Sequence, residues 1–151
     1  MKFKKLESGR SMVEMLGVLA IIGVLSVGGI AGYSLSMRRH RANGIVDLAS
    51  KYALVLYGQC QQKIMDGTAD HVTKCSNFPK YTDAGVGALP AGVQSIRPGG
   101  IEDPKSDGTD HVKIYAYYND QKLCQAVASI AGTSCDKGGT NYSTVITIKQ
   151  N

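Results

Sequence analysis

The longest pattern in the chain is a run of apolar residues near its N-terminus. From residue 15 to residue 37, 23 consecutive positions carry no ionisable side chain apart from Tyr33. As a helix this run would be about 35 Å long, enough to cross a hydrocarbon layer of about 30 Å. The pattern therefore predicts a membrane-spanning helix rather than a buried core helix.

After this run, the apolar residues take the spacing of a helix with a single apolar face. Ile45, Ala49, Tyr52 and Leu56 recur at intervals of three or four, and most charged and amide side chains fall on the opposite side. The helix should end near Gly67, because glycine suits a helix C-cap. One helix over residues 11–65 would be about 80 Å long, more than a domain of this size could bury. We therefore expect a lollipop shape, with the first half of the helix in lipid or against other subunits.

The middle of the chain has little periodicity. Residues 67–109 hold all four prolines and many glycines, which predicts a long loop with a short strand at residues 93–97.

The last third predicts a small sheet and a second helix. Alternation over residues 111–118 predicts a strand with one apolar face, formed by Val112, Ile114, Ala116 and Tyr118. Residues 123–130 predict a short helix, and residues 143–149 a final strand. The expected fold class is α+β, a long N-terminal helix packed on a small antiparallel sheet.

Composition fits one domain of ordinary character. The chain has 151 residues, of which 43% are hydrophobic and 19% charged, and its formal charge is +5. These values exclude a disordered or polyelectrolyte chain.

The four cysteines indicate disulfides. Their spacings of 15, 49 and 11 match no zinc signature, so disulfides formed in an oxidising compartment are the better interpretation. Four cysteines permit three connectivities. We favour Cys60 with Cys75 and Cys124 with Cys135, because both pairs close short loops, each of which stabilises by about 3 kcal/mol.

A lone acid marks the start of the apolar run. A basic leader (Lys2, Lys4, Lys5) leads to Gly9, and Glu14 is the last charged residue before the run. A carboxylate beside hydrocarbon usually has a partner. Cleavage after Gly9 would supply one, since the new α-amino group of Arg10 would lie four residues from Glu14 and be cationic at neutral pH.

Gly9, the four-residue spacing to Glu14, and the run Gly-Val-Leu-Ala-Ile-Ile-Gly-Val-Leu at residues 17–25 together resemble the class III signal of type IV prepilins and pseudopilins. The resemblance covers about the first thirty residues. It implies a leader at residues 1–9, a transmembrane and filament-core helix at residues 10–37, and an amphipathic helix with a disulfide-bonded head at residues 38–151.

The resemblance also implies how the chain is processed. A prepilin peptidase of the inner membrane would cut between Gly9 and Arg10 and the new terminus would be N-methylated. Pilus assembly machinery would then extract the subunit into a homo-oligomeric helical filament. In that family the glutamate, here Glu14, pairs with the N-terminal amine of a neighbouring subunit. The family usually begins its mature chain with an apolar residue, so Arg10 is a departure that adds a charge to the filament core.

The function implied is that of a non-enzymatic structural subunit, held in the bacterial inner membrane as a precursor and then part of an extracellular pilus for adhesion, motility or DNA uptake. The resemblance implies that the Cys124–Cys135 loop is the C-terminal disulfide loop that pilins often use for surface contacts. No cofactor or metal is expected. Removing residues 1–9 leaves a formal charge of +3, too small to indicate nucleic-acid binding by one subunit.

Other interpretations stay open. A secretory signal cut after Ala31, or an uncut signal anchor, would also place the head outside, but neither explains Glu14. A pseudopilin of a type II secretion system would share the N-terminal signal, and a signal-anchored periplasmic binding protein or enzyme would have a ligand pocket. Residues 102–110 offer several oxygen ligands for calcium, although a solvated turn is the simpler interpretation.

Overall fold

The computed structural model describes residues 12–69, 75, 77–102 and 109–150. Its contacts divide the chain into two compact units, Met1–Met37 and Arg38–Asn151. The long helix α1 (Met12–Met65, 54 residues) contributes to both. The second unit, called the head below, contains the rest of the secondary structure. The fold class is α+β, as predicted.

The head half of α1 supplies one wall of the core. Its buried positions are fully inaccessible to solvent and, apart from the adjacent Tyr52 and Ala53, lie three or four residues apart: Ala42, Ile45, Ala49, Tyr52, Ala53, Leu56 and Cys60. The helix ends as the sequence predicts. Gly67 has a φ of 71°, and the Thr68 amide donates to the Lys63 carbonyl at 2.9 Å, which is the bond that closes a Schellman motif.

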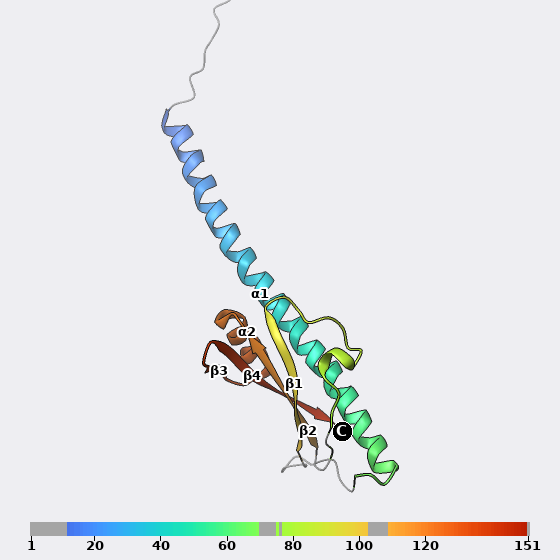
Figure 1. Cartoon of the computed structure of the whole chain (residues 1–151). Coiled ribbons are helices and arrows are strands. Elements are labelled where there is room, and N and C mark those ends of the chain that lie inside the picture. Colours follow the sequence, from blue (N-terminus) through green and yellow to red (C-terminus); the bar gives the residue numbers. More distant parts are fainter. Residues whose placement is uncertain (1–11, 70–74, 76, 103–108, 151) are drawn as a thin grey trace, which may run out of the picture. The chain divides into compact units, whose positions relative to one another are not determined.

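The other wall is a four-stranded antiparallel sheet. Its strands are β1 (Val93–Glu102), β2 (Asp110–Tyr118), β3 (Cys135–Gly138) and β4 (Asn141–Gln150). Their order across the sheet is β1-β2-β4-β3 (Figure 1).

One face of the sheet lies in the core. The predicted apolar face of β2 is confirmed, since Val112, Ile114, Ala116 and Tyr118 are fully buried. Helix α2 (Gln121–Ala131) adds Leu123, Cys124 and Val127 to the same cluster. The Asp120 side chain caps the start of α2, and Gly132, in the left-handed conformation, ends it.

The prediction of a long loop over residues 67–109 is wrong in two places. Strand β1 continues past residue 97 to Glu102, and a short 3-10 helix, η2 (Tyr81–Asp83), precedes it. Pro98 does not end β1 because β1 is an edge strand, where a missing N–H breaks no ladder bond. Strand β3 was not predicted either, because its four residues carry no alternation.

Both edges of the sheet are poor templates for further strands. The β1 edge contains Pro98 and two register irregularities, between Val93 and Ser95 and between Pro98 and Gly100. The β3 edge is only four residues long. Prolines, bulges and short strands are the usual means by which an edge avoids pairing with another chain.

The second face of the sheet is covered by its own side chains. The Arg97 guanidinium lies 5.3 Å from the centre of the Tyr117 ring, and Lys113 forms an ion pair with Glu102. A Cβ at Gly99 would come within 2.5 Å of the Tyr115 ring, so glycine is required where that ring crosses β1.

Candidate functional site

The first half of α1 is apolar and exposed. It contains an 18-residue window with a mean hydropathy of 2.2, long and apolar enough to cross a membrane, and none of that window is buried. Val24 and Leu25 are 75% and 68% exposed, and every residue from 12 to 36 is exposed. Aliphatic surface on this scale requires a lipid or protein environment.

Glu14 lies in the first turn of α1, beside Met15 and Val18 on the same apolar surface. A carboxylate at a helix N-terminus is favoured by the helix dipole, typically by about 0.3–1 kcal/mol. Within the described part of the chain Glu14 forms no hydrogen bond or ion pair. Its position leaves the carboxylate available to a cation that is not among the described residues.

Gly9 and Arg10, where the sequence predicts cleavage and methylation, lie outside the described residues. Most of the candidate calcium segment, residues 103–108, lies outside them as well. Among the residues that are described, no cluster of three or more histidine, cysteine or acidic side chains could hold a metal ion.

All four cysteines form disulfides. Cys60 near the end of α1 is bonded to Cys75, and Cys124 of α2 to Cys135 at the start of β3. These are the pairs that the short loops favour. The Cα atoms are 5.6 and 5.7 Å apart, within the usual range. Together with the apolar helix, two disulfides indicate an extracytoplasmic protein, membrane-anchored or secreted.

A tyrosine in α1 holds the helix to the segment that precedes β1. The Tyr52 hydroxyl donates to the Pro79 carbonyl, and its ring meets the Tyr81 ring edge to face at 5.4 Å. Burial, and to a smaller extent the nearby Asp83 carboxylate, raises the pKa of Tyr52 to about 12.

A second tyrosine joins α1 to the sheet. The Tyr57 hydroxyl donates to Asp110 at the start of β2 at 2.9 Å. Burial first, and this hydrogen bond second, raise the pKa of Tyr57. Sequence analysis missed both tyrosine contacts. Periodicity places Tyr52 on the apolar face but gives no sign of a hydrogen bond to a residue 27 positions away.

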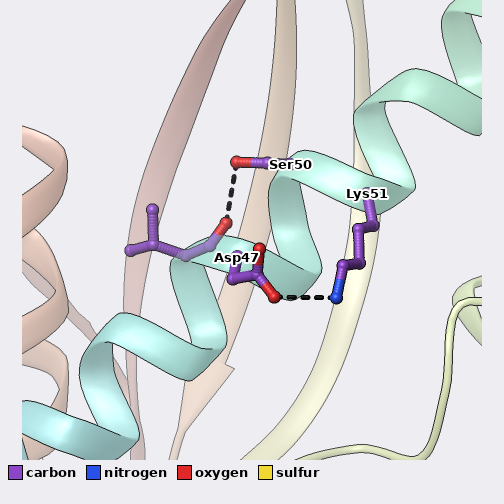
Figure 2. A network of polar contacts seen from close by, with 4 residues as sticks. Asp47, Ser50 and Lys51 are labelled. Atoms are coloured by element: carbon purple, nitrogen blue, oxygen red, sulfur yellow. Dashed lines mark hydrogen bonds and ion pairs between the residues drawn. The ribbon is translucent and has the colours of Figure 1, made fainter.

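The outward face of α1 in the head is polar. Figure 2 shows Lys51 paired with Asp47 at 2.8 Å, one turn apart, and the Ser50 hydroxyl donating to the Val46 carbonyl. Both charged side chains are more than half exposed, so the pair contributes little to stability. Asp47 is nevertheless a useful comparison for Glu14, because it is the other exposed acid of α1 and has a partner.

A groove of about 540 Å³ lies between the η2 segment and β1. Its lining includes Phe78, Tyr81 and Ile96, with Lys80 and Arg97 as its charged residues. Among these described lining residues there is no histidine, cysteine or carboxylate that would suggest a reaction.

No protein-family model, curated protein or solved structure matches the chain. What the structure establishes is the architecture. A long N-terminal apolar helix, packed through its second half on a four-stranded antiparallel sheet, is pilin-like.

Proposed function

We propose that the chain is the precursor of a type IV pilin, a non-enzymatic structural subunit of a surface filament. The observation that carries the proposal is the first half of α1, an exposed apolar helix with a carboxylate, Glu14, at its start that has no partner among the described residues.

The proposed mechanism begins with cleavage between Gly9 and Arg10 by a prepilin peptidase, followed by N-methylation of Arg10. The new terminus is a cation, and Glu14 of an adjacent subunit is the acid that it meets. Charge neutralisation then allows the apolar halves of α1 to pack together as assembly machinery withdraws subunits from the membrane. The pairing removes two isolated charges from an apolar environment, where each alone would cost several kcal/mol.

The head supports the same proposal. The Cys60–Cys75 disulfide and the Tyr52 hydrogen bond join the second half of α1 to the segment before β1, and the Tyr57 hydrogen bond joins it to β2. A subunit pulled by its N-terminal helix needs such a connection, because force on α1 is otherwise resisted only by apolar packing.

The processing step is tested by the intact mass and N-terminal sequence of the protein from its native membrane, with and without active prepilin peptidase. We expect a methylated chain that begins at Arg10 and depends on the enzyme. A start at Gly32 would identify a secreted protein and an intact Met1 a signal anchor, and both would contradict the proposal.

The assembly step is tested with Glu14→Ala. We expect filaments to fall at least tenfold while the amount of processed subunit in the membrane stays normal. Asp47→Ala is the matched control, because it removes an exposed acid from the same helix and should leave filament yield within twofold. Wild-type filament levels in Glu14→Ala would refute the role of Glu14. Filaments confined to the periplasm would indicate a pseudopilin.

A further inference from the structure

Three arginines follow directly after the apolar half of α1. Arg38, Arg39 and Arg41, with His40 between them, occupy consecutive positions of the helix, and we call the three arginines the basic collar. Successive helical residues are rotated by about 100°, so the collar presents cations on several sides of the helix. Arg39 and Arg41 are exposed, and Arg38 is partly buried.

The collar has no acidic partner within the described part of the chain. None of its arginines forms an ion pair there, and the next acid along the helix, Asp47, is paired with Lys51. Three adjacent uncompensated guanidinium groups repel one another. They favour a partner with several negative charges close together, and guanidinium matches phosphate in charge and shape.

The position of the collar specifies which phosphates are near. From Glu14 to Arg38 the helix rises about 36 Å, which matches a hydrocarbon layer plus part of the headgroup region. Tyr33, one to two turns before the collar, is 68% exposed, and exposed tyrosines are enriched at membrane interfaces. A span of this length, an interfacial tyrosine and then arginines place the collar at the level of lipid headgroups.

The positive charge of the collar also opposes transfer of the head across the membrane. Arginines close to the end of a span resist translocation across the inner membrane. Lys2, Lys4 and Lys5 offset this in the precursor, and the proposed cleavage leaves only Arg10 and the new α-amino group as cations on that side. A compensating interaction on the outer side would keep the mature subunit in place.

We propose that the basic collar binds the phosphate groups of anionic phospholipids in the leaflet next to the head, and so anchors the subunit before assembly. The inference rests on the proposed function for its orientation. Each basic side chain at an anionic surface strengthens binding by roughly fivefold, so three together give a preference between about tenfold and a hundredfold over a zwitterionic lipid.

The test uses the full chain purified in detergent with equal amounts of phosphatidylglycerol and phosphatidylcholine, and mass spectrometry of the lipid that it retains. We expect wild type to retain phosphatidylglycerol over phosphatidylcholine by at least tenfold. The triple variant Arg38→Gln, Arg39→Gln, Arg41→Gln should lower this ratio at least fivefold, and the preference that remains is that of the basic residues before the span, Lys2, Lys4 and Lys5. Replacing the three arginines by lysine should keep most of the preference.

The matched control is Lys80→Gln, Lys122→Gln, Lys137→Gln, which removes the same charge from exposed positions elsewhere on the head. It should retain the wild-type ratio. An unchanged ratio in the collar variant, or an equal loss in the control, overturns the proposal. The double variant Arg39→Gln, Arg41→Gln changes only exposed side chains, and an intermediate ratio is expected even if the triple variant folds poorly.

This readout is separate from that of the proposed function. If the chain prefers phosphatidylglycerol but is never cut after Gly9, the proposed function is wrong, and the collar is a lipid anchor in a membrane protein that is not a pilin. A correctly processed subunit without the preference would refute the collar alone.

Discussion

The two halves of α1 belong to one unbroken helix but differ in how their apolar residues are distributed and buried. In the head half, seven side chains of α1 are fully buried, and apolar residues alternate with polar ones at helical spacing. In the first half, apolar side chains point in every direction and all of residues 12–36 are exposed. The comparison shows that forming a helix does not by itself determine what the helix packs against. A helix with one apolar face packs on the core of its own domain, whereas a helix that is apolar on all sides requires lipid or other protein chains around it.

The difference has an energetic meaning. Fully burying a leucine, isoleucine or valine contributes about 1.5–3 kcal/mol, and the first half of α1 leaves many such contributions unrealised within one chain. Its apolar surface is therefore available to drive association with lipid or with other copies, whereas the apolar surface of the head half has already been used in folding.

The sharpest test of this contrast compares two leucines on the head half. Leu56 is fully buried and Leu54 is 58% exposed. Leu56→Ala should lower the free energy of unfolding by about 2–5 kcal/mol, because it leaves a cavity in the core, whereas Leu54→Ala should change it by about 0.5 kcal/mol or less. Urea unfolding of the full chain in detergent, followed by the tyrosine signal of the head, measures both.

Leu25→Ala extends the test to the other half. Leu25 is 68% exposed and should leave unfolding of the head unchanged. An effect on the head comparable to that of Leu56→Ala would mean that the two halves are not energetically distinct.

The next largest effect concerns the disulfide at the end of α1. Replacing Cys60 and Cys75 together by alanine should lower the free energy of unfolding by about 3 kcal/mol, because the bond closes a loop of 15 residues. Reducing agent provides the control. It should destabilise wild type more than the double variant, which retains only the Cys124–Cys135 bond. Equal sensitivity would show that the Cys60–Cys75 bond contributes nothing.

A smaller effect is expected from single hydroxyl groups. Tyr52→Phe removes the hydrogen bond to Pro79 and should cost about 1 kcal/mol. Tyr118→Phe is the matched control. The Tyr118 hydroxyl is buried without a hydrogen-bond partner among the described residues, so its removal should be neutral or slightly stabilising. A cost of Tyr118→Phe equal to that of Tyr52→Phe would point to a partner for Tyr118.

Tyr52→Phe also makes a prediction about alkaline pH. Because the pKa of Tyr52 is raised from 10.0 to about 12 in the folded protein, the folded state holds its proton longer than the unfolded state. This contribution to stability is complete below pH 10 and is lost as the pH rises through 12. Tyr52→Phe should therefore lose less stability than wild type between pH 10 and 12, as measured by urea unfolding at several pH values.

The sequence predicts those parts of the fold that depend on local pattern. The extent of α1, the Gly67 end, the apolar face of β2 and the helix α2 all follow from periodicity and caps. Strand β1 beyond Pro98 does not, because it depends on pairing with β2 and on the space that Gly99 leaves for Tyr115. The contact between Tyr57 and Asp110 joins residues 53 positions apart and has no local signal.

For the candidate site, the sequence was the better guide. Glu14 is conspicuous as a single acid before an apolar run, and the structure adds that no described residue compensates it. The cation that we propose for it belongs to another copy of the chain, and the pair is therefore completed only in the assembled filament. The basic collar is visible in the sequence as well, but its lack of ion-pair partners required the structure.

The irregular and short edge strands of the sheet have a consequence for contacts between neighbouring heads in the proposed filament. With Pro98 and two irregularities on one edge and four residues on the other, neighbouring heads have little opportunity to join through backbone hydrogen bonds. Contacts between heads would then be formed almost entirely by side chains. A substitution on the surface of a head would therefore alter such a contact without disturbing a strand.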